Sequence, residues 1–217
     1  MTAEEMIAAV EQALSALEPS YRGEATESDL YEACLLAILI QAARDAGGTT
    51  LITNDGVRPA PLLRFRRSPG YLWRGNFSYG IVSFRGSSKV LEAHLGVYVA
   101  GVSGVPHECD VALIDQIEAN RSRAGGVHPR RRGLVASLEA KHYVASPGIG
   151  IGRGFIGLSA ELGQRKCCLG FPARSSSTIA ALIARKPSEC FDQLQPDTPA
   201  ATRLRAHLDQ EIRNWIA

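Results

Sequence analysis

The chain has 217 residues, of which 45% are hydrophobic and 21% charged, and its net charge is +2. This length and composition are typical of one globular domain and exclude a chain built of biased, low-complexity tracts. The most apolar run, residues 33–40, is far too short to span a membrane. The chain begins with an acidic, amphipathic segment that does not resemble a signal peptide, so we expect a cytoplasmic protein.

The five cysteines are odd in number and have no C-x-x-C spacing. This pattern argues against a disulfide framework and against a structural zinc site. We expect buried thiols without a chemical role.

The charges are unevenly distributed along the chain. Residues 1–32 carry eight acids and one base, which leaves the remainder at +9. Two segments, Arg58–Arg74 and Arg121–Arg132, each contain five arginines and no acid. Such basic segments fit a polyanionic partner such as nucleic acid, although solvated loops also collect arginines.

Hydrophobic periodicity predicts an α/β fold with a mixed central sheet flanked by helices. Helices are expected at 3–17, 28–46, about 155–162, 175–186 and 200–216. Strands are expected at 79–85, 89–101, 107–115, 133–144 and 166–173. The chain shows no internal repeat and no linker that would divide it, so we expect a single domain over residues 1–217.

The strand "GLVASLEAKHYV", residues 133–144, carries two opposite charges in an apolar run. Because side chains alternate along a strand, Glu139 and Lys141 share one face, about 7 Å apart. Two such residues can form an ion pair on an edge strand. The preceding strand, "HECDVALID", begins with acids and places Asp110 where a neighbouring strand could bring it to the same point.

Two carboxylates form an oxygen site that suits Mg²⁺, which keeps positions open for water and phosphate oxygens. An ammonium group beside that metal can orient a water molecule and offset charge that develops on a phosphate. Asp110, Glu139 and Lys141 are therefore candidates for phosphodiester hydrolysis.

The segments "GVPHECD" and "SLEAKHY" resemble the E-x-D and E-x-K motifs of the PD-(D/E)xK nuclease superfamily. The resemblance covers residues 27–186, with helical additions at both ends, and implies a restriction-endonuclease-like core. It implies a nuclease dependent on Mg²⁺, with Mn²⁺ as a substitute, that cuts DNA, or alternatively RNA, in a restriction, defence or repair system. The alternative is a non-catalytic nucleic-acid-binding or assembly subunit that retains the fold.

In this resemblance Asp110 and Glu139 match the metal-binding acids, and Lys141 matches the catalytic lysine. Glu32, on the predicted helix 28–46, matches an additional acid that many members carry, although a carboxylate near a helix N-terminus is also favourable by itself. Glu108 is a weaker candidate, and His107 and His142 are as readily bystanders as ligands.

The gap between Asp110 and Glu139 is longer than in most members, because an arginine-rich segment is inserted there. We expect this segment and the earlier basic one to contact nucleic acid through Arg121, Arg123, Arg130, Arg131, Arg132, Arg66 and Arg67. Cutting both strands of a duplex requires two sites, so a homodimer or a subunit of a larger assembly is expected.

Two other motifs have competing interpretations. "GRGFIG", residues 152–157, satisfies the G-x-G-x-x-G dinucleotide-binding pattern, but it begins nine residues after Tyr143, too far for the tight turn that the pattern requires. Residues 64–74 interleave arginines with Phe65, Tyr71 and Trp73, which either stack on exposed bases or pack beneath a loop.

Overall fold

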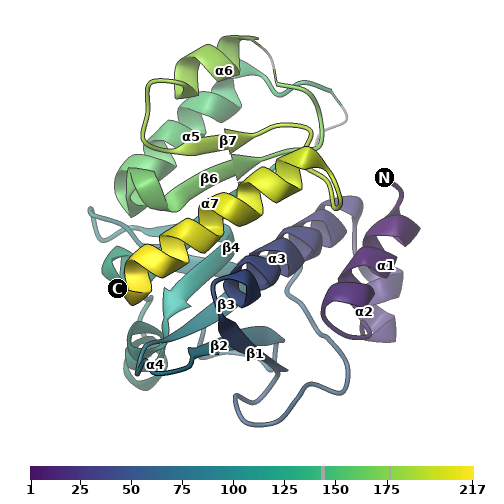
Figure 1. The fold of residues 1–217 in the computed structure, drawn as a ribbon, viewed down its shortest axis with the longest axis vertical. Helices are drawn as coiled ribbons and strands as arrows, with labels where there is room; N and C mark the ends of the chain where they lie inside the picture. The colour runs from purple at the N-terminus through teal and green to yellow at the C-terminus, as the bar shows by residue number, and fades with distance from the viewer. Residues whose placement is uncertain (143–144, 176) are drawn as a thin grey trace.

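The structure is a computed structural model that describes residues 1–142, 145–175 and 177–217 (Figure 1). The helices are α1 (Ala3–Ala13), α2 (Pro19–Glu24), α3 (Glu27–Asp45), α4 (Gln116–Gly125), α5 (Ile149–Leu162), α6 (Ser177–Ile183) and α7 (Pro199–Ile216). The strands are β1 (Gly48–Thr53), β2 (Tyr79–Phe84), β3 (Val90–Ala100), β4 (Pro106–Asp115), β5 (Leu134–Ala140), β6 (Cys167–Gly170) and β7 (Glu189–Phe191). Two short 3₁₀ turns lie at Arg131–Gly133 and Gln164–Lys166.

The seven strands form one mixed sheet in which the spatial order follows the chain order, from β1 to β7. Neighbours from β1 to β5 are antiparallel, whereas β5, β6 and β7 run parallel. Parallel neighbours need crossover connections, and α5 and α6 provide them. The predicted α/β architecture, a mixed sheet flanked by helices, is confirmed.

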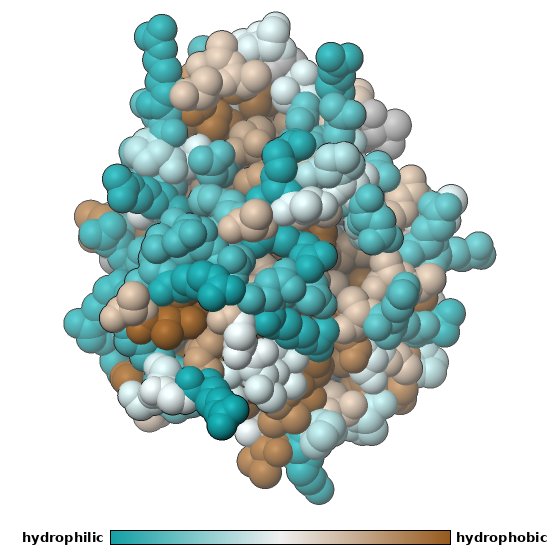
Figure 2. Space-filling view, in the orientation of Figure 1, coloured by the Kyte–Doolittle hydropathy of each residue, from teal (hydrophilic) through white to brown (hydrophobic). Residues whose placement is uncertain are grey.

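Helices cover both faces of the sheet. On one face α3 and α7 lie side by side (Figure 1), and together with α1 they enclose the larger core. On the other face α4, α5 and α6 enclose a second core with residues of β3 to β6. The outward side of α7 is hydrophilic (Figure 2), as expected for an amphipathic helix whose apolar residues Leu204, Leu208 and Ile212 are buried.

The start of α3 is fixed by its own sequence. The Thr26 side chain accepts from the Asp29 N–H, and the Asp29 carboxylate accepts from the Thr26 N–H at 2.7 Å. This reciprocal capping box satisfies two backbone donors that a helix otherwise leaves unpaired. It fixes the end of α3 that carries Glu32.

The arginine-rich segment between β4 and β5 begins within a helix, α4, which carries Arg121 and Arg123, whereas Arg130–Arg132 lie beyond its end. Asp115 caps α4 by accepting from the Ile117 N–H, and Gly126 ends it with a left-handed φ of 57°. Both residues are standard helix boundary signals, but the polar composition of α4 hides the apolar periodicity that sequence analysis relies on.

Four further elements differ from the sequence prediction. Strand β1 lies between the predicted helix 28–46 and the predicted strand 79–85, where its partly exposed residues lack alternation, and β7, which was also not predicted, is only three residues long. Helix α5 begins at Ile149 and so includes the glycine-rich segment. The predicted strand 133–144 ends at Ala140, and its last residues, Tyr143 and Val144, lie outside the described residues.

The glycines inside α5 generate a stability prediction. A Cβ built at Gly154 would meet no atom of the described residues within 4 Å, whereas one at Gly152 would lie 3.0 Å from Leu182 Cδ2. Gly154→Ala should therefore raise the free energy of unfolding by about 0.5–1 kcal/mol, through helix propensity alone. Gly152→Ala should raise the free energy of unfolding by less. Equal increases for the two variants in urea denaturation would contradict the close packing of α5 on α6.

Candidate active site

Strands β4 and β5 part next to the predicted catalytic residues. Their backbone pairing runs from Ile114↔Leu134 to Val111↔Leu138 and goes no further in the register. Beyond it the Ala140 N–H donates to the side chain of Asp110, at 2.6 Å from Oδ2. The Lys141 N–H donates to the Gly170 carbonyl of β6 at 2.9 Å. A carboxylate thus replaces a backbone acceptor where β5 separates from β4 and remains paired with β6.

Lys141 joins the two carboxylates that flank this point. Its Nζ lies 2.7 Å from Glu139 Oε1 and 3.6 Å from Asp110 Oδ2. The Asp110 side chain is 7% exposed, and those of Glu139 and Lys141 are 19% and 27% exposed. The structure therefore brings together the three residues that sequence analysis paired across two strands, and it leaves Lys141 and Glu139 within reach of solvent.

At Gly96 of β3, the side chains of the strand change from one hydrophobic core to the other. Leu95, before Gly96, packs in the larger core, whereas Val97 packs in the second core, and Gly96 itself has a left-handed φ of 59°. On β4 the same change separates Val111 from Cys109. Asp110 lies at this change, which places its carboxylate close enough to α3 to interact with Glu32.

Burial and neighbouring carboxylates raise the pKa values of the acids in this region. Burial, the largest cause, and the carboxylates of Asp110, Asp29 and Glu108 together raise the pKa of Glu32 to about 8, while Lys141 opposes them. Burial is also the main cause of the raised pKa values of Asp110, Glu139 and Glu108. Four acids with raised pKa values therefore lie near one ammonium group, and a bound cation would favour the ionised form of each of them.

The donor set fits a hard divalent cation, although the site is not a ready-made cage. Within the described residues no three Asp, Glu, His or Cys side chains converge into a metal-binding group. Asp110 and Glu139 supply two carboxylates, which is sufficient for Mg²⁺ because this ion commonly retains water ligands. In this structure their shared neighbour is the Lys141 ammonium group.

The two histidines near the motifs contact other acids. His142 lies against the Tyr31 ring at a centroid distance of 5.4 Å, and its Nδ1 is 3.9 Å from Glu27. His107 Nε2 lies 3.5 Å from Glu161. Neither contact involves the Asp110–Glu139–Lys141 group.

Most arginines predicted to bind nucleic acid have intramolecular partners. Glu118, which is 5% exposed, accepts from Arg121 and Arg130, and its carboxylate lies 3.5 Å from Arg132 Nε. Glu92 pairs with Arg123. The basic segments themselves contain no acid, as the sequence shows, but the fold brings acids from other parts of the chain to their arginines.

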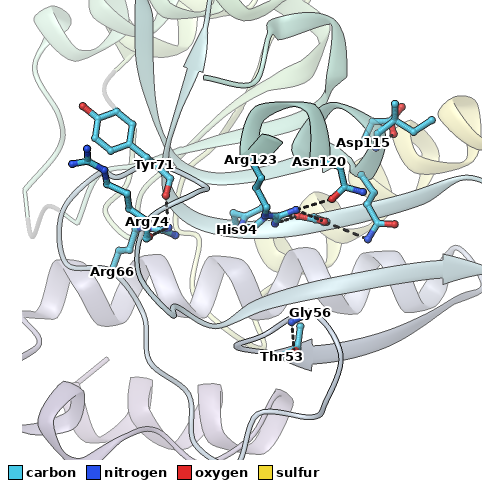
Figure 3. Close-up of polar contacts among 12 residues, drawn as sticks. Thr53, Gly56, Arg66, Tyr71, Arg74, His94, Asp115, Asn120 and Arg123 are labelled. Carbon is cyan, nitrogen blue, oxygen red and sulfur yellow. Dashed lines mark hydrogen bonds and ion pairs between the residues drawn. The ribbon is translucent and has the colours of Figure 1, made fainter. Parts of the chain in front are cut away.

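The remaining three predicted arginines have different surroundings. Arg67 pairs with Glu24 at 2.7 Å. Arg66 is 7% exposed and donates from Nη2 to the carbonyls of Tyr71 and Arg74 (Figure 3), so it supports the loop from within. Arg131 is exposed. Contacts of these arginines with nucleic acid stay a prediction.

Sequence analysis missed a buried polar cluster on β3 and α4. Glu92 is 1% exposed and bonds with His94 at 2.8 Å, with Arg123 at 3.0 Å and with Gln116 at 3.3 Å. Figure 3 labels His94 and Arg123 of this cluster. Burial opposes its ionisation, but the bonds from His94 and Arg123 hold the pKa of Glu92 at about 2. The cluster borders a cavity of about 500 Å³, to which Tyr79 also contributes.

Because the charged groups of this cluster pair with one another, we interpret it as a clamp that holds α4 against β3. The signal for it was the Glu-x-His pair in strand 89–101. Its partner, Arg123, lies 31 residues further along the chain, too far for local pattern analysis.

Comparison of the chain with protein-family profiles, with curated proteins and with solved structures finds no match in any of the three. Among the described residues, no helix is long and apolar enough to cross a membrane.

The raised pKa of Glu32 predicts a pH-dependent stability difference in protein kept free of metal with EDTA. Glu32 titrates near 4.5 when unperturbed and near 8 in the folded chain. Wild type should therefore lose stability as the pH rises from about 4.5 to 8, because the unfolded state releases this proton first. Glu32→Gln should melt at the same temperature as wild type near pH 4.5 and above it at pH 8, in thermal melts followed by circular dichroism.

The exposed Glu4→Gln variant is the control for this series, and its difference from wild type should not change over the same pH range. A constant difference between Glu32→Gln and wild type would contradict the assignment.

The Glu92 clamp gives a second prediction. Glu92→Ala should lower the free energy of unfolding by about 3–5 kcal/mol, because it leaves half-buried Arg123 and buried His94 without their anion. Glu92→Gln should cost less, because the amide oxygen still accepts hydrogen bonds. Urea denaturation measures both, with the exposed Glu189→Ala as the control, and a loss below about 1 kcal/mol for Glu92→Ala would argue against a clamp.

Proposed function

We propose that this chain is a Mg²⁺-dependent nuclease of the PD-(D/E)xK type, with a restriction-endonuclease-like core. The observation that carries the proposal is the convergence of Asp110, Glu139 and Lys141 where β4 and β5 part. Supporting it, the E-x-D and E-x-K motifs lie on adjacent strands of a mixed sheet, and a buried helix adds Glu32 beside them.

Each residue of the candidate site has a separate role in the proposed reaction. Asp110 and Glu139 would hold Mg²⁺, which supplies charge neutralisation at the scissile phosphate. The hydrogen bond from the Ala140 N–H fixes the Asp110 carboxylate, so that its orientation does not depend on the metal. Lys141 can donate hydrogen bonds to a phosphate oxygen or to the attacking water.

Hydrolysis adds the water oxygen to phosphorus and breaks one P–O bond, and the proton lost by the water is balanced by the one gained by the leaving oxygen. With a pKa of about 8, the Glu32 carboxyl group holds a proton near neutral pH in the metal-free chain. It is the group of this site best matched to proton transfer in that pH range.

The alternative is a non-catalytic nucleic-acid-binding or assembly subunit that retains the fold. One observation favours it: Lys141 Nζ lies 2.7 Å from Glu139 Oε1, so the pair neutralises itself without a metal. Against it, a surface that only binds phosphates gains nothing from several additional carboxylates, which repel them.

The proposal extends to the partner and the setting. The substrate is DNA, with RNA as the second possibility, and cutting both strands of a duplex would require a homodimer or an assembly with a second site. A cytoplasmic location follows from the sequence expectation alone.

Cleavage assays test the function directly. Wild type should degrade plasmid and oligonucleotide DNA with Mg²⁺ or Mn²⁺ but not with EDTA. Asp110→Asn, Glu139→Gln and Lys141→Ala should each lower the rate at least about 100-fold, the size expected when one charge-stabilising group is removed. Glu161→Gln, which alters an acid outside the site, should cleave at the wild-type rate.

Two results would overturn the nuclease proposal. One is the absence of cleavage with either metal on any DNA or RNA tested, together with no Mn²⁺ binding by calorimetry. The other is cleavage that all three variants retain, which would indicate a contaminating nuclease.

A further inference from the structure

An aromatic cluster gathers at the end of β3, away from the main cores. Its members, here called the aromatic platform, are Tyr71, Trp73, Tyr98 and His128. Tyr71 lies at the centre, with ring centroids 4.6 Å from Trp73, 5.2 Å from His128 and 6.2 Å from Tyr98. Hydrogen bonds fasten the contributing segments to β3, because the Tyr98 N–H donates to the Gly70 carbonyl and the Ala100 N–H to the Pro129 carbonyl.

The platform is not part of the buried interior. Tyr71 is 37% exposed, and the other three members are half-buried. Most other aromatic residues of the chain are buried: Tyr21, Tyr31, Phe65, Phe84, Phe155, Phe171 and Phe191. Rings left together at the surface forgo part of the hydrophobic gain of burial, and such patches commonly mark binding surfaces.

The platform borders the candidate active site through strand pairing. Tyr98 of β3 is paired directly with Glu108 of β4. Directly paired residues present their side chains on the same side of a sheet, so Tyr98 stands next to Glu108. Asp110 follows two residues later on the same strand, and the pKa of Glu108 responds to both Asp110 and Lys141.

The electrostatics of the platform suit a nucleobase with its phosphate. Burial lowers the pKa of His128, which keeps its ring neutral near pH 7. The Arg74 guanidinium lies over the Tyr71 ring, 5.3 Å from its centroid. Figure 3 shows Tyr71 and Arg74 close to Arg66 and apart from the His94–Arg123 group. Proteins that bind single-stranded nucleic acids commonly combine aromatic rings with neighbouring cations in this way.

The pairing of arginines with acids makes this surface less suited to a duplex than to a single strand. Affinity for a duplex comes largely from cations placed along the phosphate backbone. Here Glu118 and Glu92 engage Arg121, Arg130 and Arg123 instead. The bases of an intact duplex are stacked on one another, so exposed rings can stack only on bases that are unpaired.

We propose that the aromatic platform stacks unpaired nucleobases, and that the substrate of the neighbouring site is a single-stranded nucleic acid or a single-stranded segment of a longer one. The cutting rests on the proposed nuclease function, whereas the stacking does not.

Intrinsic fluorescence gives a direct test, because the chain has two tryptophans, Trp73 and Trp215. Trp215 lies on α7 against Lys89, so Trp215→Phe leaves Trp73 as the reporter. Oligothymidylate, oligouridylate and a duplex of equal length are titrated in EDTA and in Ca²⁺. We expect saturable quenching with at least one single strand and at least 10-fold weaker binding of the duplex.

Variants then assign the binding to the rings. In anisotropy titrations with a labelled oligonucleotide, Tyr71→Ala and Trp73→Ala should each weaken binding about 5- to 100-fold. Tyr71→Phe keeps the ring and should bind as wild type does. A thermal melt of each variant shows whether it is folded. If Tyr71→Ala or Trp73→Ala is not folded, Tyr71→Phe and Arg74→Ala are compared instead. Loss of the Arg74 cation should weaken binding, whereas the change from Tyr71 to Phe should not.

The outcomes separate the two proposals. Quenching and ring-dependent affinity in a chain that does not cleave would uphold the platform and overturn the nuclease. Metal-dependent cleavage of duplex that Tyr71→Ala leaves unchanged would uphold the nuclease and overturn the platform. Equal binding of duplex and single strand, or no quenching with any oligonucleotide, would also overturn the platform.

Discussion

The hydrogen bond from the Ala140 N–H to Asp110 Oδ2 is the interaction on which the candidate site depends. Where two strands part, buried backbone donors lose their acceptors, and an unpaired buried donor is costly. Asp110 supplies the missing acceptor, so β5 can leave β4 and continue its pairing with β6. The same carboxylate lies within 3.6 Å of the Lys141 ammonium group. One side chain therefore maintains the separation of the strands and forms part of the site that the separation opens.

Most arginines of the two basic segments pair with carboxylates of the same chain. Glu118 gathers three arginines at the start of the β4–β5 connection, and Glu92 holds a fourth. Acids of the N-terminal region, Glu18 and Glu24, pair with Arg64 and Arg67. The uneven charge distribution along the sequence thus becomes a set of local pairs in space. A count of arginines along a segment overestimates the positive charge that it offers to a partner.

Sequence analysis could predict what depends on local periodicity. The alternation in β5 placed Glu139 beside Lys141, and the order of the strands placed Asp110 next to them, as the structure shows. It missed α4, whose exposed polar face carries little apolar signal, and β1 and β7, which are marginal edge elements of the sheet. It also missed the pairing of Glu92 with Arg123, because contacts between distant segments depend on packing that no local pattern encodes.

The candidate site and the aromatic platform complement each other physically. The acids near Lys141 outnumber it, and burial is the main cause of their raised pKa values, so protons and metal ions compete for the same oxygens. Such a site repels a phosphodiester until a cation balances it. Stacking on neutral rings is less sensitive to this repulsion, because it acts on the base and not on the phosphate. A strand held first by its bases would therefore stay near the site while its phosphate waits for the cation that makes close approach favourable.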